Sequence, residues 1–487
     1  MNSHLNSVRR LRELDEVTAG SVDVLVVGGG VTGCGIALDA ASRGLSVALV
    51  EKDDLAFGTS RWSSKMIHGG LRYLATGDVG IAMESARERG IAMTRTAPHL
   101  IRALPMVVPV SRDLSRRDAA LALAGGRAAD LLRLAARTPR SVLPGPRRLG
   151  VTETTRLLPA VRRDGLRAGL LYWDGQLEDD ARLVVALART AAAHGARILT
   201  RVRYAADGTL TDTLTGATLS IGARTVVNAT GAWADTITPG TRLRPSKGVH
   251  VVLAAATLGH PTAGMTVPVL GEANRFVFAL PHPDGIVHVG LTDDPLEGPL
   301  PEVPRADESE IAFLLGTLSR GLEVPLRRSD VIGSFAGVRP LIAGVEGRTA
   351  DLSRRHSVRL DDGLLTVLGG KLTTYRRMAQ DAVDLVTDRP CRTAELALVG
   401  AGPVGTGRLA RRYGTEAAHV AACGSLDPVA DGVPVLSAEL AWGMRAEGAL
   451  DAADLLERRT RLSLVDSWVE AATPAALLAV EDWYAKA

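Results

Sequence analysis

A glycine-rich turn between an apolar run and a helical pattern is the strongest chemical signal in the sequence. The largely apolar run Val22–Val27 is typical of a buried strand, Gly28–Gly33 reads GGGVTG, and apolar residues then recur at helical spacing. In such a unit Gly28 permits a tight turn, Gly30 lets a pyrophosphate approach the backbone, and Gly33 lets helix and strand pack closely. The turn therefore predicts a dinucleotide site.

An acidic residue stands where a ribose would be bound. Glu51 follows a second apolar run, Ser46–Val50, about twenty residues after the glycine turn. A carboxylate at this position accepts hydrogen bonds from a ribose diol and argues against a 2′-phosphate. FAD or NAD is therefore favoured over NADP.

Residues 58–74 carry many hydroxyls, a lysine, a histidine and a glycine pair, but no amphipathic period. Burying such a stretch is costly unless a polar ligand contacts it. Hydroxyls and backbone amides suit a pyrophosphate or a flavin edge, and paired glycines allow the backbone to pass against a planar ring. The cofactor-facing candidates here are Ser60, Ser63, Ser64, Gly69 and Gly70.

Three later segments combine an apolar strand with a glycine or a cation. The strand within Thr225–Trp233 ends in Ala-Thr-Gly, which makes Gly231 a second candidate for close approach to a nucleotide. Arg339 ends another strand, directly before a proline. Residues 365–376 again indicate strand, glycine turn and helix, where free helix N–H groups lie beside a lysine. The candidates in this last segment are Gly370, Lys371 and Thr373.

The surrounding patterns predict the elements that must position these residues. Apolar residues alternate from Lys247 to Gly290, which indicates antiparallel sheet. We therefore predict an α/β protein with a dinucleotide-binding domain over residues 20–245, completed by 331–390, a substrate domain of antiparallel sheet over 246–330, and a helical domain over 391–487. The histidines His250, His282 and His288 are interpreted as strand residues, because no acid or cysteine stands at metal-ligand spacing, and no metal is predicted.

Composition excludes several other classes of protein. The chain of 487 residues is long enough for two or three domains, and its net charge of +3, with no basic run interleaved with aromatics, gives no support for nucleic-acid binding. The three cysteines, Cys34, Cys391 and Cys423, have no redox or metal spacing, which favours a reducing compartment. No apolar window approaches the ~20 residues of a membrane span, and we expect a cytoplasmic protein.

Basic residues are distributed unevenly. Between Ser115 and Arg148 arginines outnumber acids, and leucines supply an apolar side. Such a segment can lie at a membrane interface, or it can be a solvated helix packed on its own domain. Lysine is rare in the chain, so Lys65, Lys247 and Lys371, all within glycine- or serine-bearing motifs, suggest places that need a compact point charge.

Taken together, four motifs resemble the FAD-dependent sn-glycerol-3-phosphate dehydrogenases. They are GGGVTG at 28–33, SSKMIHGGLRYL at 63–74, GVRP at 337–340 and GGKLTTYR at 369–376. The resemblance implies a glutathione-reductase-type FAD-binding fold with an inserted antiparallel-sheet substrate domain and a helical C-terminal cap domain. It further implies oxidation of sn-glycerol 3-phosphate to dihydroxyacetone phosphate, with electrons passed through FAD to a quinone at the inner face of the membrane.

The resemblance also assigns roles to individual residues. Arg72 and Tyr73 match a substrate-pocket pair, Arg339 an active-site arginine, Arg354 a phosphate-binding arginine, and Lys371 a lysine near substrate and flavin. A phosphate with nearly two negative charges suits bidentate arginines, which Arg72 and Arg354 would supply.

The expected reaction requires a base and a positive charge. A hydride leaves C2 for the flavin while the C2 hydroxyl loses its proton, so a developing alkoxide must be stabilised. Arginine is a poor base because its pKa lies above about 12. We therefore assign Arg339 to electrostatic stabilisation and His68 to the base, with Lys371 in support.

Several alternatives remain open. A glycerol-3-phosphate oxidase would run the same half-reaction with oxygen as acceptor, although the basic segment at 115–148 favours quinone. An amine- or amino-acid-oxidising flavoprotein should lack the paired phosphate arginines, and a non-catalytic flavoprotein would lack turnover. Residues 174–180 and the short segment after Arg392 depart from the family pattern, which affects one pocket wall and the oligomer and membrane contacts. The resemblance alone suggests a homodimer.

Overall fold

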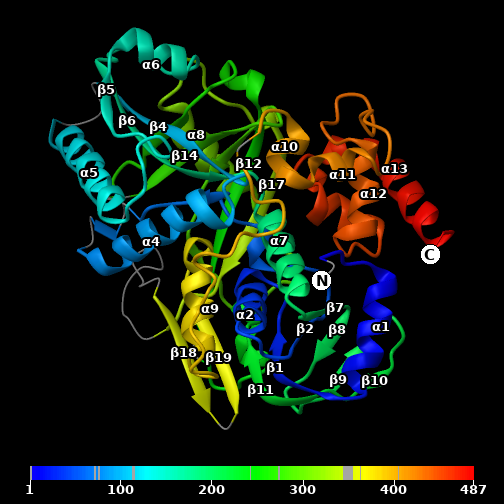
Figure 1. Cartoon of the computed structure of the whole chain (residues 1–487). Helices are drawn as coiled ribbons and strands as arrows, with labels where there is room; N and C mark the ends of the chain where they lie inside the picture. The colour runs from blue at the N-terminus through cyan, green and yellow to red at the C-terminus, as the bar shows by residue number, and fades with distance from the viewer. Residues whose placement is uncertain are drawn as a thin grey trace.

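The computed structural model describes residues 3–70, 73–74, 77–111, 116–241, 243–272, 275–343, 355–361, 363–403 and 405–486. Within these residues the strands form a six-stranded sheet, a ten-stranded sheet and a small three-stranded sheet, and the C-terminal part is helical (Figure 1). No helix in this described part combines the length and the apolar character that crossing a bilayer requires.

The six-stranded sheet carries the predicted dinucleotide turn. Strand β1 lies between β11 and β2 and is parallel to both, so the carboxyl ends of these strands meet at one edge. Among the described strands of this sheet, only the edge strand β18 is antiparallel to its neighbour. The order across the sheet is β18 (His356–Asp361), β19 (Leu364–Gly369), β11 (Gly222–Asn228), β1 (Ser21–Val27), β2 (Val47–Glu51) and β7 (Arg197–Thr200).

Both faces of this sheet are covered, which explains why its strands are apolar without alternation. Val24 and Val26 belong to the buried cluster formed with helices on one face. Leu25 and Val27 point the other way and pack with the N-terminal helix and the small sheet. The first face is covered by α2 (Val31–Ser42), α7 (Asp180–Ala193) and α9 (Tyr375–Val383). The second is covered by α1 (Ser7–Thr18), β8 (Val202–Tyr204), β9 (Leu210–Asp212) and β10 (Thr218–Leu219).

The ten-stranded sheet lies above the six-stranded sheet in the view of Figure 1. Eight strands follow one another across it: β16 (Asp294–Pro295), β12 (Ser246–Ala254), β15 (Ile286–Gly290), β14 (Phe276–His282), β13 (Gly264–Pro268), β4 (Ile101–Val110), β6 (Ala168–Leu177) and β3 (Met66–Ile67). In addition β17 (Val331–Arg339) pairs with β12, and β5 (Arg147–Leu149) pairs with β6. Helix α8 (Glu308–Ser319) packs against one face of this sheet, and the two share a buried hydrophobic cluster.

This sheet extends well beyond the predicted range of 246–330. Strands β3 to β6 come from residues 66–177, which we expected in the dinucleotide-binding domain, and β17 comes from 331–339. The alternation of apolar residues shows that a segment is extended, but it does not show which distant strand will pair with it. The substrate sheet is therefore assembled from three separated parts of the chain.

The remaining helices flank these sheets. Figure 1 shows α5 and α6 at the outer end of the ten-stranded sheet, away from the C-terminal helices. The α-helices are α4 (Val79–Ile91), α5 (Arg116–Ala135) and α6 (Val151–Leu157). The short 3-10 or π segments are η1 (Thr59–Arg61), η2 (Ala92–Thr96), η3 (Gly231–Thr236), η4 (Ala255–Leu258), η5 (Arg328–Asp330) and η7 (Leu372–Thr374).

The C-terminal part is helical, as the sequence predicts for residues after 391. Its buried cluster of Val433, Leu440, Leu455 and Ala472 shows that it has an apolar core of its own. Its elements are α10 (Arg408–Tyr413), η8 (Gly414–Glu416), α11 (Ala417–Ala421), α12 (Ser437–Ala446), η9 (Asp454–Arg459), η10 (Leu462–Leu464) and α13 (Asp466–Tyr484).

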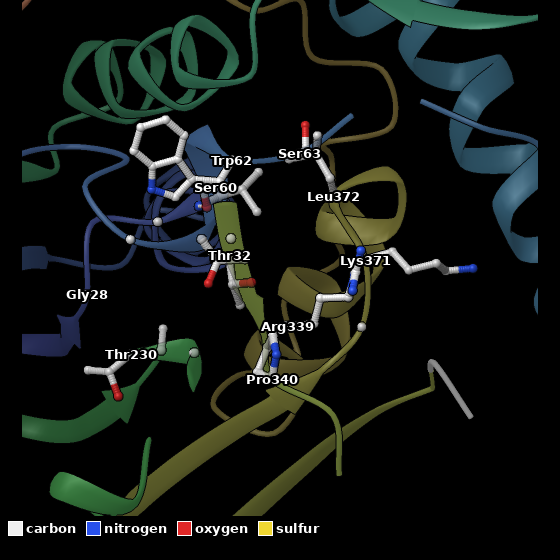
Figure 2. Close-up of a pocket in the computed structure, with 18 of the residues that line it drawn as sticks. Gly28, Thr32, Ser60, Trp62, Ser63, Thr230, Arg339, Pro340, Lys371 and Leu372 are labelled. Carbon is white, nitrogen blue, oxygen red and sulfur yellow. Dashed lines mark hydrogen bonds between the residues drawn. The ribbon is translucent and has the colours of Figure 1, made fainter. Parts of the chain in front are cut away.

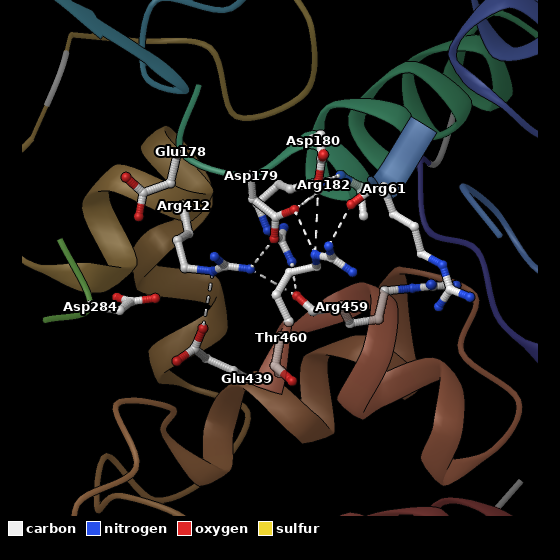
Figure 3. Close-up of polar contacts among 12 residues, drawn as sticks. Arg61, Glu178, Asp179, Asp180, Arg182, Asp284, Arg412, Glu439, Arg459 and Thr460 are labelled. Atoms are coloured by element: carbon white, nitrogen blue, oxygen red, sulfur yellow. Dashed lines mark hydrogen bonds and ion pairs between the residues drawn. The ribbon is translucent and has the colours of Figure 1, made fainter. Parts of the chain in front are cut away.

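Buried ion pairs join this C-terminal domain to the rest of the chain. Asp54, which is 0% exposed, accepts from Arg458 Nε at 2.6 Å and from both terminal nitrogens of Arg459 at 2.7 and 2.8 Å. At the start of α7, Asp179 accepts from Arg412 Nη2 at 2.8 Å. Figure 3 shows Asp179 and Asp180 facing the C-terminal domain from this helix end. The domain is thus held by charge as well as by apolar contact.

Candidate active site

A cavity of about 790 Å³ lies between the carboxyl ends of β1, β2 and β11 and the inner face of the ten-stranded sheet. Its size falls within the range of small-molecule and cofactor sites, roughly 300 to 1,000 Å³. Figure 2 shows Gly28 and Thr230 on one side and Arg339 and Lys371 on another. The cavity therefore brings together the glycine turn and the two predicted cations.

The glycine turn has the close approaches that the motif predicts. Gly28 has a φ of +115°, and a Cβ there would lie 2.7 Å from the carbonyl oxygen of Ala229. A Cβ on Gly33 would lie 1.9 Å from the carbonyl oxygen of Gly28. Gly28 and Gly30 line the cavity, whereas Gly33 serves the helix–strand contact.

Helix α2 begins directly at this turn. Gly30 is the N-cap and provides no side-chain cap, while the Val31 N–H donates to Ser60 Oγ at 2.9 Å. Thr32 also lines the cavity. Unpaired N–H groups and the positive end of a helix suit a pyrophosphate, so Ser60 lies where a phosphate neighbour is expected.

Glu51 lines the cavity at the end of β2, as predicted for a ribose-binding acid. Its carboxylate accepts the N–H of Gly29 at 2.7 Å and that of Asp53 at 2.9 Å. Burial raises the pKa of Glu51 to about 7. These two backbone bonds fix the carboxylate in front of the turn.

The wall beyond Glu51 was not predicted from the sequence. Residues 202–206 of β8 and the turn after it line the cavity, together with Lys52 and Glu302. No glycine or charge pattern distinguishes residues 202–206, so only the position of β8 beside β2 places them at the cavity.

Two predicted serines line the cavity with their hydroxyls engaged by protein groups. Ser63 donates from both N and Oγ to Asp180 Oδ2, at 2.9 and 2.8 Å. Ser64 Oγ lies 2.8 Å from His250 Nε2. His250 lies in strand β12, as predicted, and it also lines the cavity. His250 alternates along β12 with Val249 and Val251, which are buried. This alternation is the sequence signal that predicts a different face of the strand for His250.

Gly69 and Gly70 do not line the cavity, contrary to the expectation that they pass against a planar ring. Gly69 N donates to Asp174 Oδ1 at 3.0 Å, and a Cβ on Gly69 would lie 2.3 Å from Arg89 Nη1. Gly70 has a φ of +75°. A glycine is needed at 69 because a buried Arg89–Asp174 pair, 2.6 Å apart, occupies the space beside it, and at 70 because of the positive φ.

His68, Tyr73 and Lys371 meet in one part of the cavity wall, where the His68 and Tyr73 ring centroids lie 6.4 Å apart. The Lys371 Nζ donates to Ser85 Oγ at 2.5 Å and lies 4.3 Å from the centroid of the Tyr73 ring. The His68 N–H donates to Thr373 Oγ1 at 3.2 Å, which joins the second and fourth sequence motifs.

Arg339 ends β17 with its guanidinium in the cavity wall. Nη1 donates to Asp293 Oδ1 at 3.0 Å and to Ser246 Oγ at 3.1 Å, and Nη2 donates to the Thr292 carbonyl at 3.2 Å. These partners hold the cation in one orientation. The pairing with Asp293 was not predicted, since no pattern links a strand-end arginine to a loop 46 residues earlier.

The remaining predicted residues divide into two groups. Gly231 and Gly370 line the cavity beside Thr373. Arg72 and Arg354 lie outside the described residues. The residues that line the cavity include the N-terminus of α2, the acid Glu51 and the cations Arg339 and Lys371, a donor set that fits FAD.

Comparison with known proteins agrees with this chemistry. Residues 23–376 match the family model of FAD dependent oxidoreductases, and residues 399–484 match the C-terminal domain of alpha-glycerophosphate oxidase. The glycerol-3-phosphate dehydrogenase 1 of Mycobacterium tuberculosis is 52% identical to this chain over 491 residues, covering 95% of each protein.

Two solved structures extend the comparison. The glycerol-3-phosphate dehydrogenase from Bacillus halodurans, complexed with FAD, has a TM-score of 0.76 and 27% identity and covers 98% of this chain and 94% of its own. The L-alpha-glycerophosphate oxidase from Mycoplasma pneumoniae with FAD bound has a TM-score of 0.56 and 21% identity over 78% of this chain and 99% of its own, which shows the fold alone.

Proposed function

Because this chain belongs to the FAD-dependent glycerol-3-phosphate dehydrogenase family, we propose that it oxidises sn-glycerol 3-phosphate to dihydroxyacetone phosphate and passes the electrons to a quinone. The observation that best supports the substrate is the meeting of Arg339, Lys371 and His68 in one cavity with the glycine turn and Glu51. FAD supplies the hydride acceptor when bound. The cations suit an anionic substrate and an oxygen that gains negative charge.

Arg339 is proposed to stabilise the alkoxide that develops at C2. Asp293 and the Thr292 carbonyl already orient its guanidinium, so little reorganisation accompanies the reaction. Lys371 and Tyr73 are proposed to contact the substrate, since the ammonium and the ring lie together in the cavity wall. Arg72 and Arg354 are still proposed to bind the phosphate of the substrate.

Two histidines are candidates for the base. His68 Nδ1 accepts the Gly70 N–H at 3.2 Å, so a neutral ring carries its proton on Nε2 and cannot accept another there. His250 is buried, which together with the nearby Lys65 and Arg339 charges keeps its pKa well below the usual value, and its Nε2 lies 2.8 Å from Ser64 Oγ. His250 acting through Ser64 therefore competes with His68 for this role.

Paired variants separate these candidates. We expect the variant that removes the base, His68→Asn or His250→Asn, to slow flavin reduction by about 100-fold or more while FAD remains bound. Anaerobic stopped-flow absorbance measures both the rate of flavin reduction and the amount of bound FAD. Near-normal reduction in one variant would remove that histidine from the role.

The electron acceptor is proposed to reach the protein at a membrane surface. On α5, Leu131 is 70% exposed and Leu134 is 62% exposed, and Arg127 and Arg137 are exposed on the same segment. This mixture suits the interface of an anionic bilayer on the cytoplasmic side. A homodimer is also proposed, from family resemblance.

An oxidase is the alternative, because the C-terminal residues match a domain of alpha-glycerophosphate oxidase. An anaerobic titration with sn-glycerol 3-phosphate tests both functions when the reduced flavin is then mixed with a soluble quinone or with air. We expect bleaching followed by reoxidation that is much faster with quinone. Fast reoxidation by air would indicate the oxidase, and a flavin that never bleaches would exclude the substrate.

A further inference from the structure

One wall of the cavity is backed by the C-terminal domain and not by solvent. Residues 57–60 and 62–64 line the cavity, and the segment 57–65 runs between it and the helices η9 and η10. A change in how η9 and Arg461 dock against this segment therefore acts directly on this wall of the cavity.

Cations from the C-terminal domain lie against the aromatic rings of this wall. The guanidinium carbon of Arg458 lies 5.5 Å from the Phe57 centroid, and that of Arg461 lies 5.1 Å from the Trp62 centroid. Arg61 completes the layer, 4.9 Å from Phe57 and 4.3 Å from Trp62. Both rings thus have the cavity on one side and charge from the C-terminal domain on another.

Hydrogen bonds fix the backbone of the same segment. Arg461 Nη2 donates to the Arg61 carbonyl at 2.5 Å, and Arg461 Nη1 donates to the Glu457 carbonyl at 2.6 Å. Arg61 Nη1 in turn donates to Glu457 Oε2 at 2.5 Å. Arg461 therefore bridges the wall and the C-terminal domain with one side chain.

Asp180, the first residue of α7, holds the end of the wall. Its Oδ2 accepts from the N and Oγ of Ser63 and from Lys65 Nζ, which lies at 3.2 Å. Asp180 is 0% exposed and Lys65 is 2% exposed. Arg461 Nε lies 3.8 Å from Asp180 Oδ1, so one carboxylate is shared between the cavity wall and the C-terminal domain.

We propose that Asp180 and Arg461 are positioning residues of the FAD site, and that docking of the C-terminal domain and binding of FAD strengthen each other through them. Binding free energies are reciprocal, so a domain that orders residues 57–65 favours FAD, and FAD favours the docked domain. The inference rests on FAD as the cofactor and not on the substrate, so it and the proposed reaction can fail separately.

Arg461→Met tests the bridge, with Arg408→Met as the matched control. Arg408 belongs to the same domain and is similarly buried, but its partners are Asp284 and Glu439, at 2.8 and 2.7 Å, away from the wall. We expect Arg461→Met to raise the Kd of FAD about tenfold and Arg408→Met to change it less than about twofold. Titration of the apoprotein with FAD, followed by flavin fluorescence, measures both. Equal effects in the two variants would overturn the bridge.

A double-mutant cycle tests the carboxylate. Asp180→Asn leaves the Lys65 ammonium buried without its counter-ion, whereas Lys65→Met with Asp180→Asn removes both charges. We expect the double variant to bind FAD more tightly than Asp180→Asn alone, and its flavin midpoint potential to return toward that of the natural protein. Lys65→Met alone completes the cycle. If the effects of the two single substitutions on the Kd of FAD and on the midpoint potential simply add in the double variant, the assignment of Asp180 is overturned.

Hydrogen exchange tests the coupling in the natural protein, without relying on a variant that folds. Adding FAD to the apoprotein should slow amide exchange in residues 454–465 more than in residues 417–421 of the same domain. Protection confined to residues before 391 would overturn the proposal.

Discussion

The dinucleotide-binding layer and the C-terminal interface both have fully buried centres, but they are held together by different forces. In the first, Val24, Val26 and Leu49 are at most 1% exposed and pack on helices. In the second, Asp54 and Arg459 are each 0% exposed and bind one another. Apolar packing tolerates small changes in shape, whereas a buried charge depends on its partner. The interface is therefore the more fragile of the two regions.

Asp54→Asn should have the largest effect on stability. It leaves the Arg458 and Arg459 guanidinium groups without the carboxylate that both contact, and breaking one side of a buried pair costs about 3 to 5 kcal/mol. Urea denaturation of the holoprotein measures the free energy of unfolding. A loss smaller than that of Gly33→Ala would contradict the ranking of the two regions.

Lys65 lies where the ionic interface reaches the cavity, and the pH dependence of the unfolding free energy reports on its protonation. Burial lowers the pKa of Lys65 from 10.5 to about 8. Between these values the unfolded chain binds more protons than the folded one, so this group raises the free energy of unfolding as pH rises from 8 to 10.5. The gain is up to about 3 kcal/mol. Denaturation series on the natural protein and Lys65→Met should diverge in that window, and parallel curves would show a normal Lys65.

Gly33→Ala probes the apolar layer. Its Cβ would lie 1.9 Å from the Gly28 carbonyl oxygen, so β1 and α2 must separate. We expect a loss of about 1 to 3 kcal/mol in unfolding free energy together with weaker FAD binding. Gly80→Ala serves as a control, because the nearest atom to its Cβ is 3.6 Å away. Unchanged FAD affinity in Gly33→Ala would show that β1 and α2 accommodate the added methyl group without disturbing the cavity.

Arg12→Ala should have the smallest effect. Arg12 and Glu16 form an exposed pair on α1, 3.5 Å apart, with side chains 66% and 45% exposed. Solvent screens such pairs, so we expect a change below about 0.5 kcal/mol. The same denaturation assay applies. A loss comparable to that of Asp54→Asn would mean that burial does not decide the strength of ion pairs in this protein.

The two regions also differ in how well the sequence predicts them. The strand, glycine turn, helix and acid of residues 22–51 follow one another along the chain, and the structure confirms the strands and helix. The Asp54–Arg459 pair joins residues 405 positions apart, and arginine is too common in this chain for any one of them to stand out. Local patterns encode local geometry, and distant pairing is absent from them.

Within the site the same limit applies. Arg339 and Lys371 were predicted and line the cavity, but their partners Asp293 and Ser85 were not. The strand pattern of β12 was predicted, whereas its pairing with β17, which brings Arg339 beside Ser246, depends on residues about 90 positions later. The sequence therefore predicts which cations line the cavity, but not the groups that orient them.

The wide separation of Asp54 from its arginines has a consequence for synthesis on the ribosome. At about 5 to 20 residues per second, roughly 20 to 80 s pass between the emergence of Asp54 and that of Arg459. β19, a neighbour of β11 in the first sheet, also emerges late in translation. For most of its elongation the nascent chain therefore has an incomplete sheet, and the Asp54 carboxylate lacks its arginine partners. We expect a chaperone to bind the chain during this period.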